Sequence, residues 1–257
     1  MQQLRVTDHF RSVAPTWADL YARDGTFRTY RFLARRRSVL ALLAQAGGTC
    51  LDLGCGTGEF IPDLLDRGYE VNAVDTAEEM IAAVKERVRA ESWQGRVHAS
   101  VGDAARLDYP DSHFDAVISV GLLEYVPDVH AVLSEIQRVL KPGGSAVISV
   151  PNLASPFKVF ETAVSLAKRS ARRTLALLTS QQPPEFFRHY HFLPWRFDAQ
   201  LERAGLQKED YAFCTFGLSD ATRMAPRYLK LSRRMERFAR TPLGLLATNY
   251  IVKVHKT

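Results

Sequence analysis

Leu51-Asp52-Leu53-Gly54-Cys55-Gly56-Thr57-Gly58 is the stretch that decides how the rest of the chain is interpreted. An apolar segment, predicted to be a strand, runs into three closely spaced glycines, and a predicted helix follows. Glycine is needed where the chain turns tightly or where a ligand must touch the backbone. The start of the following helix offers free N–H groups and a partial positive charge. The pattern predicts a ligand-binding turn at the end of a strand.

The spacing of the glycines separates two kinds of nucleotide ligand. A dinucleotide fingerprint has its third glycine five positions after the first, and in this chain that position is Glu59. A carboxylate there would lie where a pyrophosphate binds. The spacing therefore disfavours NAD and favours a smaller nucleoside without phosphates. The structural alternative is a loop whose glycines only allow tight packing.

Predicted strands alternate with predicted helices on both sides of this turn. Strands separated by helices of this length indicate right-handed βαβ units and a parallel sheet, and nearly continuous apolar strands indicate a sheet covered on both faces. The predicted strands cover 50–53, 69–74, 96–101, 114–120 and 145–150, and the helices between them cover 59–67, 77–91 and 127–140.

The rhythm changes after Pro151, where a long helical stretch over 154–180 is broken by Pro183-Pro184. Because it follows the fifth strand at the edge where open α/β sheets bind ligands, we expect it to form a lid. A helix over 195–204 and two strands over 211–216 and 249–254 follow, with another helix near 222–240. We interpret the chain as a single domain over 1–257, with a helical cap (1–46), a binding core (47–153), a helical insertion or lid (154–192) and a C-terminal part of the sheet (193–257).

Two further acids follow predicted strands. Asp75 ends the second strand, 21 residues after Gly54, where an acid is placed to accept both ribose hydroxyls of a nucleoside. Asp103 follows the third strand and is placed to accept the exocyclic amine of adenine. Each acid alone fits a solvated loop or a helix cap. Together with Asp52 they converge on one crevice at the carboxyl ends of parallel strands.

At this point the residues resemble the class I S-adenosylmethionine-dependent methyltransferases, in particular the small-molecule type whose layout is similar to quinone-biosynthesis O-methyltransferases. The resemblance is specific over 49–151 and looser beyond. It implies a doubly wound, Rossmann-like α/β fold with a seven-stranded mixed sheet whose last strand is antiparallel. The stretches that carry it are Leu51–Gly58, Val74-Asp75, Gly102-Asp103-Ala104, Phe114–Val120 and Leu140–Gly144.

The resemblance also implies S-adenosyl-L-methionine as the cofactor and S-adenosyl-L-homocysteine as the product. In relatives, the region before the first strand closes over the cofactor, here Trp17 and Tyr21, and an arginine there can meet its carboxylate. The alternative for most of these arginines is a solvated helix face. The candidates for that arginine are Arg31, Arg35, Arg36 and Arg37. The implied cofactor residues are Asp52, Gly54, Cys55 and Gly56 at the methionine end, Asp75, Thr76 and Met80 along the ribose and adenosine, Asp103 and Ala104 at the adenine, and Ser119 and Val120 near the sulfonium.

Methyl transfer from a sulfonium mainly requires alignment of the acceptor, the methyl group and the sulfur. A hydroxyl acceptor must also lose its proton, for which a histidine or carboxylate is suited. Relatives often read Leu-Glu-His where this chain has Leu123-Glu124-Tyr125, and a metal-binding subset carries ligands where this chain has Gly121 and Tyr125, so we expect no metal. The catalytic candidates are Glu124, Tyr125, His189 and His191, with Tyr190 facing the substrate; His191 as a packing residue is the alternative.

The acceptor is expected to be a small, lipophilic molecule with a hydroxyl group. Methylation of nitrogen or carbon, methylation of a nucleic acid, and a cofactor-binding module without catalysis remain the alternatives. Nucleic-acid amino-methyltransferases usually carry an Asn/Asp-Pro-Pro-aromatic motif where this chain reads Ser119-Val120-Gly121-Leu122, which argues against a nucleic acid.

Composition sets the outer bounds. The 257 residues are 46% hydrophobic and 24% charged, with a net charge of +6, which is ordinary globular usage and excludes a disordered or disulfide-stapled chain. We expect a cytoplasmic protein, because the start shows no apolar signal region, no apolar run reaches the length of a membrane span, and the three cysteines form no pattern.

The positive charge is concentrated in three helical segments. Residues 23–37, 156–182 and 223–240 carry net charges of +5, +4 and +6, so the remainder of the chain is acidic. The helices over 156–180 and 223–240 are amphipathic, which predicts peripheral contact with an anionic membrane. The alternative is that both apolar faces pack onto the domain.

Overall fold

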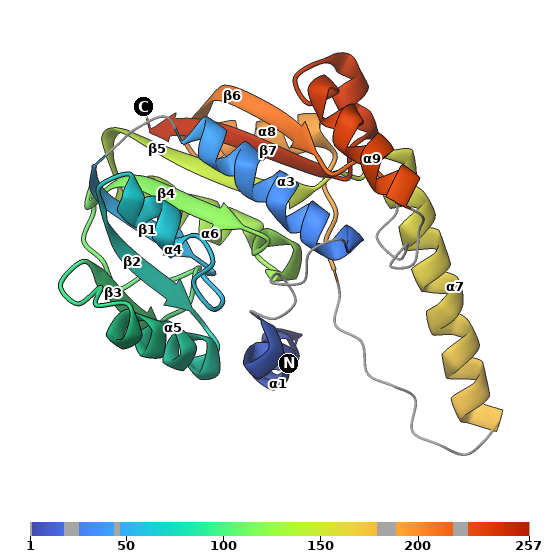
Figure 1. The fold of residues 1–257 in the computed structure, drawn as a ribbon, viewed down its shortest axis with the longest axis horizontal. Helices are drawn as coiled ribbons and strands as arrows, with labels where there is room; N and C mark the ends of the chain where they lie inside the picture. The colour runs from blue at the N-terminus through green and yellow to red at the C-terminus, as the bar shows by residue number, and fades with distance from the viewer. Residues whose placement is uncertain (1, 18–25, 44–46, 179–188, 218–225, 257) are drawn as a thin grey trace.

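A seven-stranded mixed sheet forms the centre of the protein, with the strand order β3-β2-β1-β4-β5-β7-β6 (Figure 1). The computed structural model describes residues 2–17, 26–43, 47–178, 189–217 and 226–256. The strands are β1 (Gly48–Leu53), β2 (Tyr69–Asp75), β3 (Val97–Val101), β4 (Phe114–Val120), β5 (Leu140–Pro151), β6 (Leu206–Cys214) and β7 (Asn249–Lys256).

The predicted sheet topology is confirmed. Strands β1 to β5 pair in parallel, and β7 lies antiparallel to both β5 and β6. The chain order reverses between β1 and β4, which are neighbours in the sheet. Open α/β sheets form a crevice outside the carboxyl ends of the strands at such a point. The fold therefore places the glycine turn after β1 beside the segment that follows β4.

Helices cover both faces of the sheet. The buried residues of α3, α4 and α5 belong to one core, and those of α6 and α8 belong to the core on the other face. Figure 1 shows α3 in front of the sheet and α6 and α8 behind it. The helices are α1 (Gln2–Trp17), α3 (Phe27–Leu42), α4 (Ile61–Asp66), α5 (Glu78–Ala90), α6 (Val129–Val139), α7 (Pro156–Leu178), α8 (Pro194–Arg203) and α9 (Pro226–Met235), with short 3-10 turns η1 (Leu123–Tyr125), η2 (Glu236–Phe238) and η3 (Pro242–Leu246).

Alternating side chains explain why the strands read as continuous apolar runs. In β7, Tyr250 and Val252 point into the core beneath α6 and α8, and Ile251 points into the core beneath α3. All three side chains are at most 1% exposed. Successive side chains of a strand point to opposite faces, so a strand buried on both faces must be apolar at every position.

Two predicted boundaries shift. The segment Lys141–Gly144 was expected to be a loop before the fifth strand, but β5 already begins at Leu140, which pairs with Phe114. The pairing resumes at Ala116 and Ser145, so a bulge absorbs the extra residues. Helix α6 starts later than expected, because the side chain of Asp128 caps it by accepting a hydrogen bond from the N–H of Ala131 (3.0 Å).

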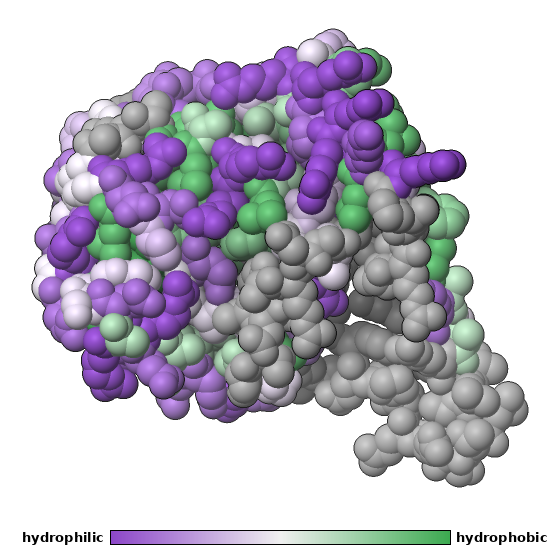
Figure 2. Space-filling model, viewed as in Figure 1, coloured by the Kyte–Doolittle hydropathy of each residue, from purple (hydrophilic) through white to green (hydrophobic). Residues whose placement is uncertain are grey.

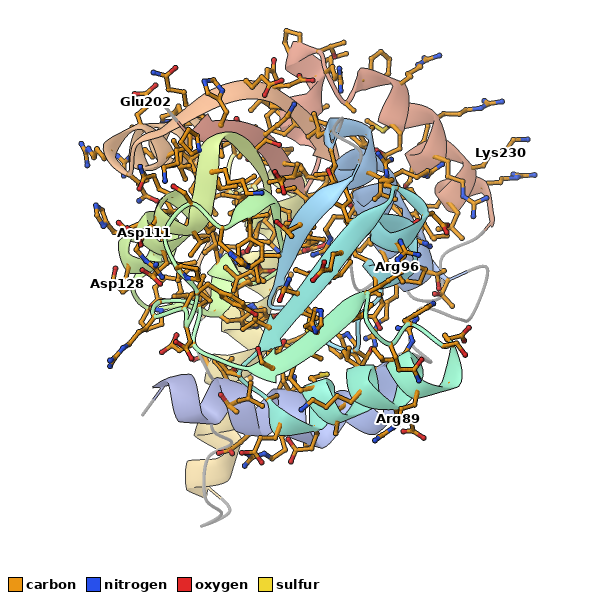
Figure 3. The ribbon with its side chains drawn as sticks, turned by 90° about the vertical axis from the view of Figure 1, so that its left-hand side faces the viewer. Arg89, Arg96, Asp111, Asp128, Glu202 and Lys230 are labelled. Atoms are coloured by element: carbon orange, nitrogen blue, oxygen red, sulfur yellow. The ribbon has the colours of Figure 1, made fainter. Side chains whose placement is uncertain are left out.

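Helix α1 lies across the carboxyl ends of the strands, beside α5 (Figures 1 and 3). The guanidinium of Arg11 donates to the carboxylate of Glu79 (3.0 Å), and the hydroxyls of Thr7 and Thr76 lie 3.4 Å apart. Ala14 packs with Ala77 and Met80. The predicted N-terminal cap is thus held over the end of β2.

Helix α7 projects away from the body of the protein (Figure 1). The segment that leads into it is tied to the body: the hydroxyl of Ser155 donates to the carbonyl of Leu246 (2.6 Å), and the amide of Asn152 donates to the carbonyls of Leu245 and Ala247 (3.0 and 2.8 Å). Phe160 and Leu166 are 57% and 59% exposed, so these two apolar side chains of α7 do not pack onto the domain. Of the helices the structure describes, none combines the length and apolarity that a membrane crossing requires.

Candidate functional site

A cavity of about 380 Å³ lies at the carboxyl ends of the strands, between α1, α3, the glycine turn, η1 and the start of α7. Most of the site residues predicted from the sequence line it. They are Trp17, Asp52, Gly54, Cys55, Gly56, Asp75, Thr76, Met80, Val120, Glu124, Tyr125, His189 and His191.

Four of the predicted site residues that the structure describes do not line this cavity. Asp103 is exposed at the turn after β3, where its carboxylate accepts the N–H of Ala105 (3.0 Å), and Ala104 is buried beside it. Ser119 is fully buried in β4, and Tyr190 packs against the core beneath α6 and α8. Tyr21 lies outside the described residues. The adenine and sulfonium roles of these residues stay predictions.

The glycine turn has the backbone that its sequence requires. Gly54, Gly56 and Gly58 have φ angles of +76°, +54° and +80°, a region that residues with a side chain rarely adopt. A Cβ on Gly58 would lie 2.6 Å from the Cδ1 of Ile61, and Gly56 borders the cavity. The N–H of Gly56 donates to the carboxylate of Asp75 (3.0 Å), which also accepts the N–H of Ala77 (2.9 Å). The end of β2 thereby fixes the position of the turn.

Three carboxyl groups, the acid cluster Asp52, Glu59 and Asp75, line the cavity around this turn. Burial, reinforced by the charges of Glu59 and Asp75, raises the pKa of Asp52 to about 8. Burial also raises the pKa values of Glu59 and Asp75. Oδ2 of Asp52 is buried and has no hydrogen-bond partner in the part of the chain that the structure describes. This part of the cavity therefore favours a cation with hydrogen-bond donors and disfavours a phosphate.

The acid cluster fits S-adenosylmethionine. The unpaired oxygen of Asp52 is available to an ammonium group, and Asp75 at the end of β2 is placed for ribose hydroxyls. The turn beside them leaves room for a ligand because Gly56 has no side chain.

A row of aromatic rings crosses the cavity wall from α1 to the segment after α7. The ring centroids of Trp17 and Phe10 lie 5.5 Å apart, those of Phe10 and Tyr125 lie 5.0 Å apart, and those of Tyr125 and His189 lie 4.8 Å apart. All four side chains line the cavity. Phe10 was missed in the sequence because its spacing indicated only an amphipathic helix.

The segment after α7 returns to the site along a short ladder of backbone hydrogen bonds. The N–H of Tyr190 donates to the carbonyl of Glu124 (2.8 Å), and the N–H of Phe192 donates to the carbonyl of Pro151 (3.0 Å). These bonds tie the segment to η1 and to the end of β5. His189 and His191, on either side of Tyr190, consequently both border the cavity.

Two of the four candidate arginines reach the cavity. Arg31 and Arg35, one helical turn apart on α3, line it. The guanidinium of Arg36 instead pairs with the carboxylate of Asp63 (2.6 Å), and that of exposed Arg37 donates to the carbonyl of Leu33 (3.3 Å). The sequence left all four arginines open, although the (i, i+4) spacing of Arg31 and Arg35 is a signal that could have placed these two on one face.

Glu124 faces three cations. Its carboxyl group is buried, Oε2 has no hydrogen-bond partner among the described residues, and burial raises its pKa, opposed by Arg35, Lys158 and Arg31. Lys158, from the first turn of α7, also lines the cavity and was not singled out in the sequence, where it was counted only as part of a basic helix. Among the described residues, no group of three or more His, Cys, Asp or Glu side chains is placed to hold a metal ion.

Comparison with known proteins agrees with a site for S-adenosylmethionine. A family model described as a methyltransferase domain matches residues 51–148. The ubiquinone biosynthesis O-methyltransferase of Xanthomonas axonopodis pv. citri is 32% identical over 212 residues, which cover 79% of this chain and 80% of that protein.

This chain belongs to the class I S-adenosylmethionine-dependent methyltransferases. The phosphatidylethanolamine N-methyltransferase of Cereibacter sphaeroides is 35% identical over 113 residues, 44% of this chain and 55% of that protein. Four curated relatives are matched over only 47–61% of their own length. A methyltransferase structure from Thermotoga maritima aligns with a TM-score of 0.62 at 16% identity, covering 96% of this chain and 98% of that one, which shows the shared fold.

The raised pKa of Asp52 makes the stability of the cofactor-free methyltransferase depend on pH. The folded protein holds the Asp52 proton up to a pH of about 8, whereas the unfolded chain releases it near pH 4. The free energy of unfolding should therefore fall as the pH rises from 5 to 8. Asp52→Asn should remove roughly 1–3 kcal/mol of that fall, measured by urea unfolding at the two pH values.

The matched control is Asp66→Asn, which changes an exposed carboxyl group at the end of α4. It should retain the pH dependence of the wild type. An Asp52→Asn variant with the same loss of stability as the wild type between pH 5 and 8 would contradict the assignment.

Proposed function

We propose that this protein transfers the methyl group of S-adenosylmethionine to a hydroxyl group of a small, lipophilic molecule. The observation that carries the proposal is that one cavity joins the acid cluster to a wall containing Glu124, two histidines and a row of aromatic rings. The first part suits a nucleoside with cationic groups, and the second suits an apolar acceptor that must lose a proton.

The cofactor supplies a methyl group on a positively charged sulfur when it is bound. The acid cluster would hold its ammonium and ribose, and Trp17 of α1 would cover it together with Met80 of α5, against whose cluster Trp17 packs. Arg35 is the cation proposed for its carboxylate, because Nη1 of Arg35 lies 2.9 Å from where a Cβ on Gly121 would be, against the end of β4. Contacts of this kind would hold the cofactor in one orientation while the acceptor binds beside it.

Glu124 is the proposed base for a hydroxyl acceptor. Its unpaired Oε2 is available to accept a proton, and its raised pKa makes it a stronger base than an ordinary carboxylate. His189 and His191 border the same cavity and are the alternatives. Tyr125 lies between Phe10 and His189 and is proposed to position the acceptor by ring contacts.

The insertion after β5 is proposed to act as a lid. Lys158 near its start and the two histidines near its end line the cavity, so described residues from both ends of the insertion border the site. Transfer to nitrogen or carbon remains the second candidate, since alignment without a base would suffice for a nucleophile that carries no proton to lose.

A methyl-transfer assay tests this proposal. With S-adenosylmethionine labelled in the methyl group, small phenols and extracted lipids should acquire label. Glu124→Gln should lower kcat by roughly 10²–10⁴-fold, the usual contribution of a general base, and leave the affinity for S-adenosylhomocysteine unchanged. Because the group acts when deprotonated, kcat of the wild type should rise with pH through the raised pKa of Glu124.

The control for this assay is Glu202→Gln, on α8 at the far side of the molecule (Figure 3), which should retain full activity. Label that appears only in tRNA or DNA would overturn the proposal. An active Glu124→Gln together with an inactive His189→Ala would move the role of the base to His189.

We propose, in addition, that the protein meets an anionic membrane through α7, α9 and η3. Phe160 and Leu166 of α7 and Leu231 of α9 are more than half exposed, and Leu243 of η3 is 52% exposed. Helix α9 also carries exposed basic side chains, which include Arg227, Lys230 and Arg234. Lys230 points away from the body (Figure 3). Figure 2 shows the hydrophilic residues gathered over α9 and hydrophobic ones along the upper part of α7. Exposed apolar and basic side chains together favour an anionic bilayer surface.

Flotation with vesicles measures this contact. The wild type should float with phosphatidylserine-containing vesicles at low salt and lose this binding at high salt, since each surface Lys or Arg contributes roughly 1 kcal/mol. Changing Arg227, Lys230 and Arg234 to Glu should abolish flotation. The same changes at Arg89, Arg106 and Arg196, exposed elsewhere on the protein, should have little effect. A wild type that stays in solution at low salt would contradict the proposed membrane contact.

A further inference from the structure

Three cations line the cavity, more than the single carboxylate of the proposed cofactor can pair with directly. Arg31 and Arg35 of α3 and Lys158 of α7 form a cation cluster on its wall. This cluster is distinct from the acid cluster: the charges that act on Asp52 are Glu59 and Asp75, whereas those that act on Glu124 are the three cations. The cavity therefore has an acidic part and a basic part.

The three cations do not have equal surroundings. Arg35 lies against Gly121 at the end of β4, and its Nε is buried without a hydrogen-bond partner among the described residues. Nζ of Lys158 lies 3.5 Å from Oε2 of Glu161, and the side chains are only 16% and 13% exposed. Arg31 takes part in none of the ion pairs found between described residues. Among acidic groups, Glu161 has the largest effect on the pKa of Arg31.

The positive charges of the cation cluster repel one another. Burial, followed by the charge of Arg35, lowers the pKa of Arg31, and burial followed by the charge of Arg31 lowers that of Lys158. Glu124 and Glu161 offset this repulsion in part. A bound anion between the cations would relieve the remaining repulsion and accept hydrogen bonds from the guanidinium and ammonium groups.

S-adenosylmethionine has a single carboxylate, and Arg35 beside the end of β4 is its proposed partner. Lys158 keeps its ion pair with Glu161, and Arg31 beside it is left for a second anion. We infer that Arg31 and Lys158 form a subsite for an anionic group of the acceptor, a carboxylate or a phosphate. This inference rests on the proposed function, which it extends from a lipophilic acceptor to an amphiphilic one.

The chemistry of the wall orients such a molecule. Arginine presents a planar fork of donors that matches the two oxygens of a carboxylate or phosphate, and lysine adds a point charge. The apolar part of the acceptor would lie along Phe10 and Tyr125, which border the same cavity. Its hydroxyl would then reach Glu124, which is held among the same cations. The anionic group would thus select the acceptor and set the distance from its hydroxyl to the methyl group.

Calorimetry with model anions tests the subsite without methyl transfer. The protein is saturated with S-adenosylhomocysteine, so that the cofactor carboxylate is already in place, and is titrated with benzoate, phenyl phosphate and neutral benzamide. At least one anion should bind roughly tenfold more tightly than benzamide, and Arg31→Gln and Lys158→Gln should each weaken that anion by about tenfold. The tighter of the two anions identifies whether the natural group is a carboxylate or a phosphate.

Arg37→Gln is the matched control, since Arg37 lies on the same helix but outside the cavity, and it should bind both ligands as the wild type does. Arg31→Lys, which retains the charge and loses the fork, should show an intermediate affinity and guards against a variant that fails to fold. Equal binding of benzamide and the anions, or an Arg31→Gln variant that loses affinity for S-adenosylhomocysteine and not for the anion, would overturn the inference. Failure of S-adenosylhomocysteine to bind would contradict the proposed function, while the same titration on the cofactor-free protein would still decide the subsite.

Discussion

The hydrogen bond from the N–H of Gly56 to the carboxylate of Asp75 holds the site together. It joins the glycine turn after β1 to the end of β2, and it exists only because Gly56 adopts a backbone angle that other residues rarely reach. The turn then leaves Asp52 buried with an unpaired oxygen beside Glu59 and Asp75. Three carboxyl groups forced together in this way are unfavourable until a cation binds, so the structure stores a preference for a cationic ligand.

The rest of the fold forms a second part of the cavity wall, whose charge is opposite to that of the acid cluster. Helix α3 brings Arg31 and Arg35, α7 brings Lys158, and the ladder from Tyr190 to Glu124 brings the two histidines. Each comes from a different part of the chain, and they meet because β1 and β4 are neighbours at the reversal of strand order. A reaction between a cationic cofactor and an amphiphilic acceptor would use both sides of such a cavity.

The sequence predicted the sheet well, and the residues that it singled out near the glycine turn line one cavity, because both depend on local patterns. The spacing of Gly54, Gly56 and Gly58, the alternation of strands and helices, and an acid at the end of β2 are all visible within short windows. Asp75, Cys55 and Met80 consequently lie on the cavity wall where they were expected.

The acceptor side was harder to predict, because it depends on contacts between distant segments. The sequence left Arg31, Arg35, Arg36 and Arg37 as equal candidates. Only the packing of α3 against the sheet shows that Arg31 and Arg35 border the cavity and that Arg36 pairs with Asp63. Lys158 appeared as one of several charges in a basic helix. The exposed apolar face of α7 was equally undecided, since an amphipathic pattern does not reveal whether the domain or another surface covers it.

Calorimetry with S-adenosylhomocysteine and the Asp75→Ala variant tests the central claim most directly. If the acid cluster is the cofactor site, the wild type binds this ligand and the variant binds it about 1–3 kcal/mol more weakly, the usual cost of losing hydrogen bonds to a charged group. Binding of NADH in place of S-adenosylhomocysteine, or equal affinity of the wild type and the variant for the adenosyl ligand, would contradict the account.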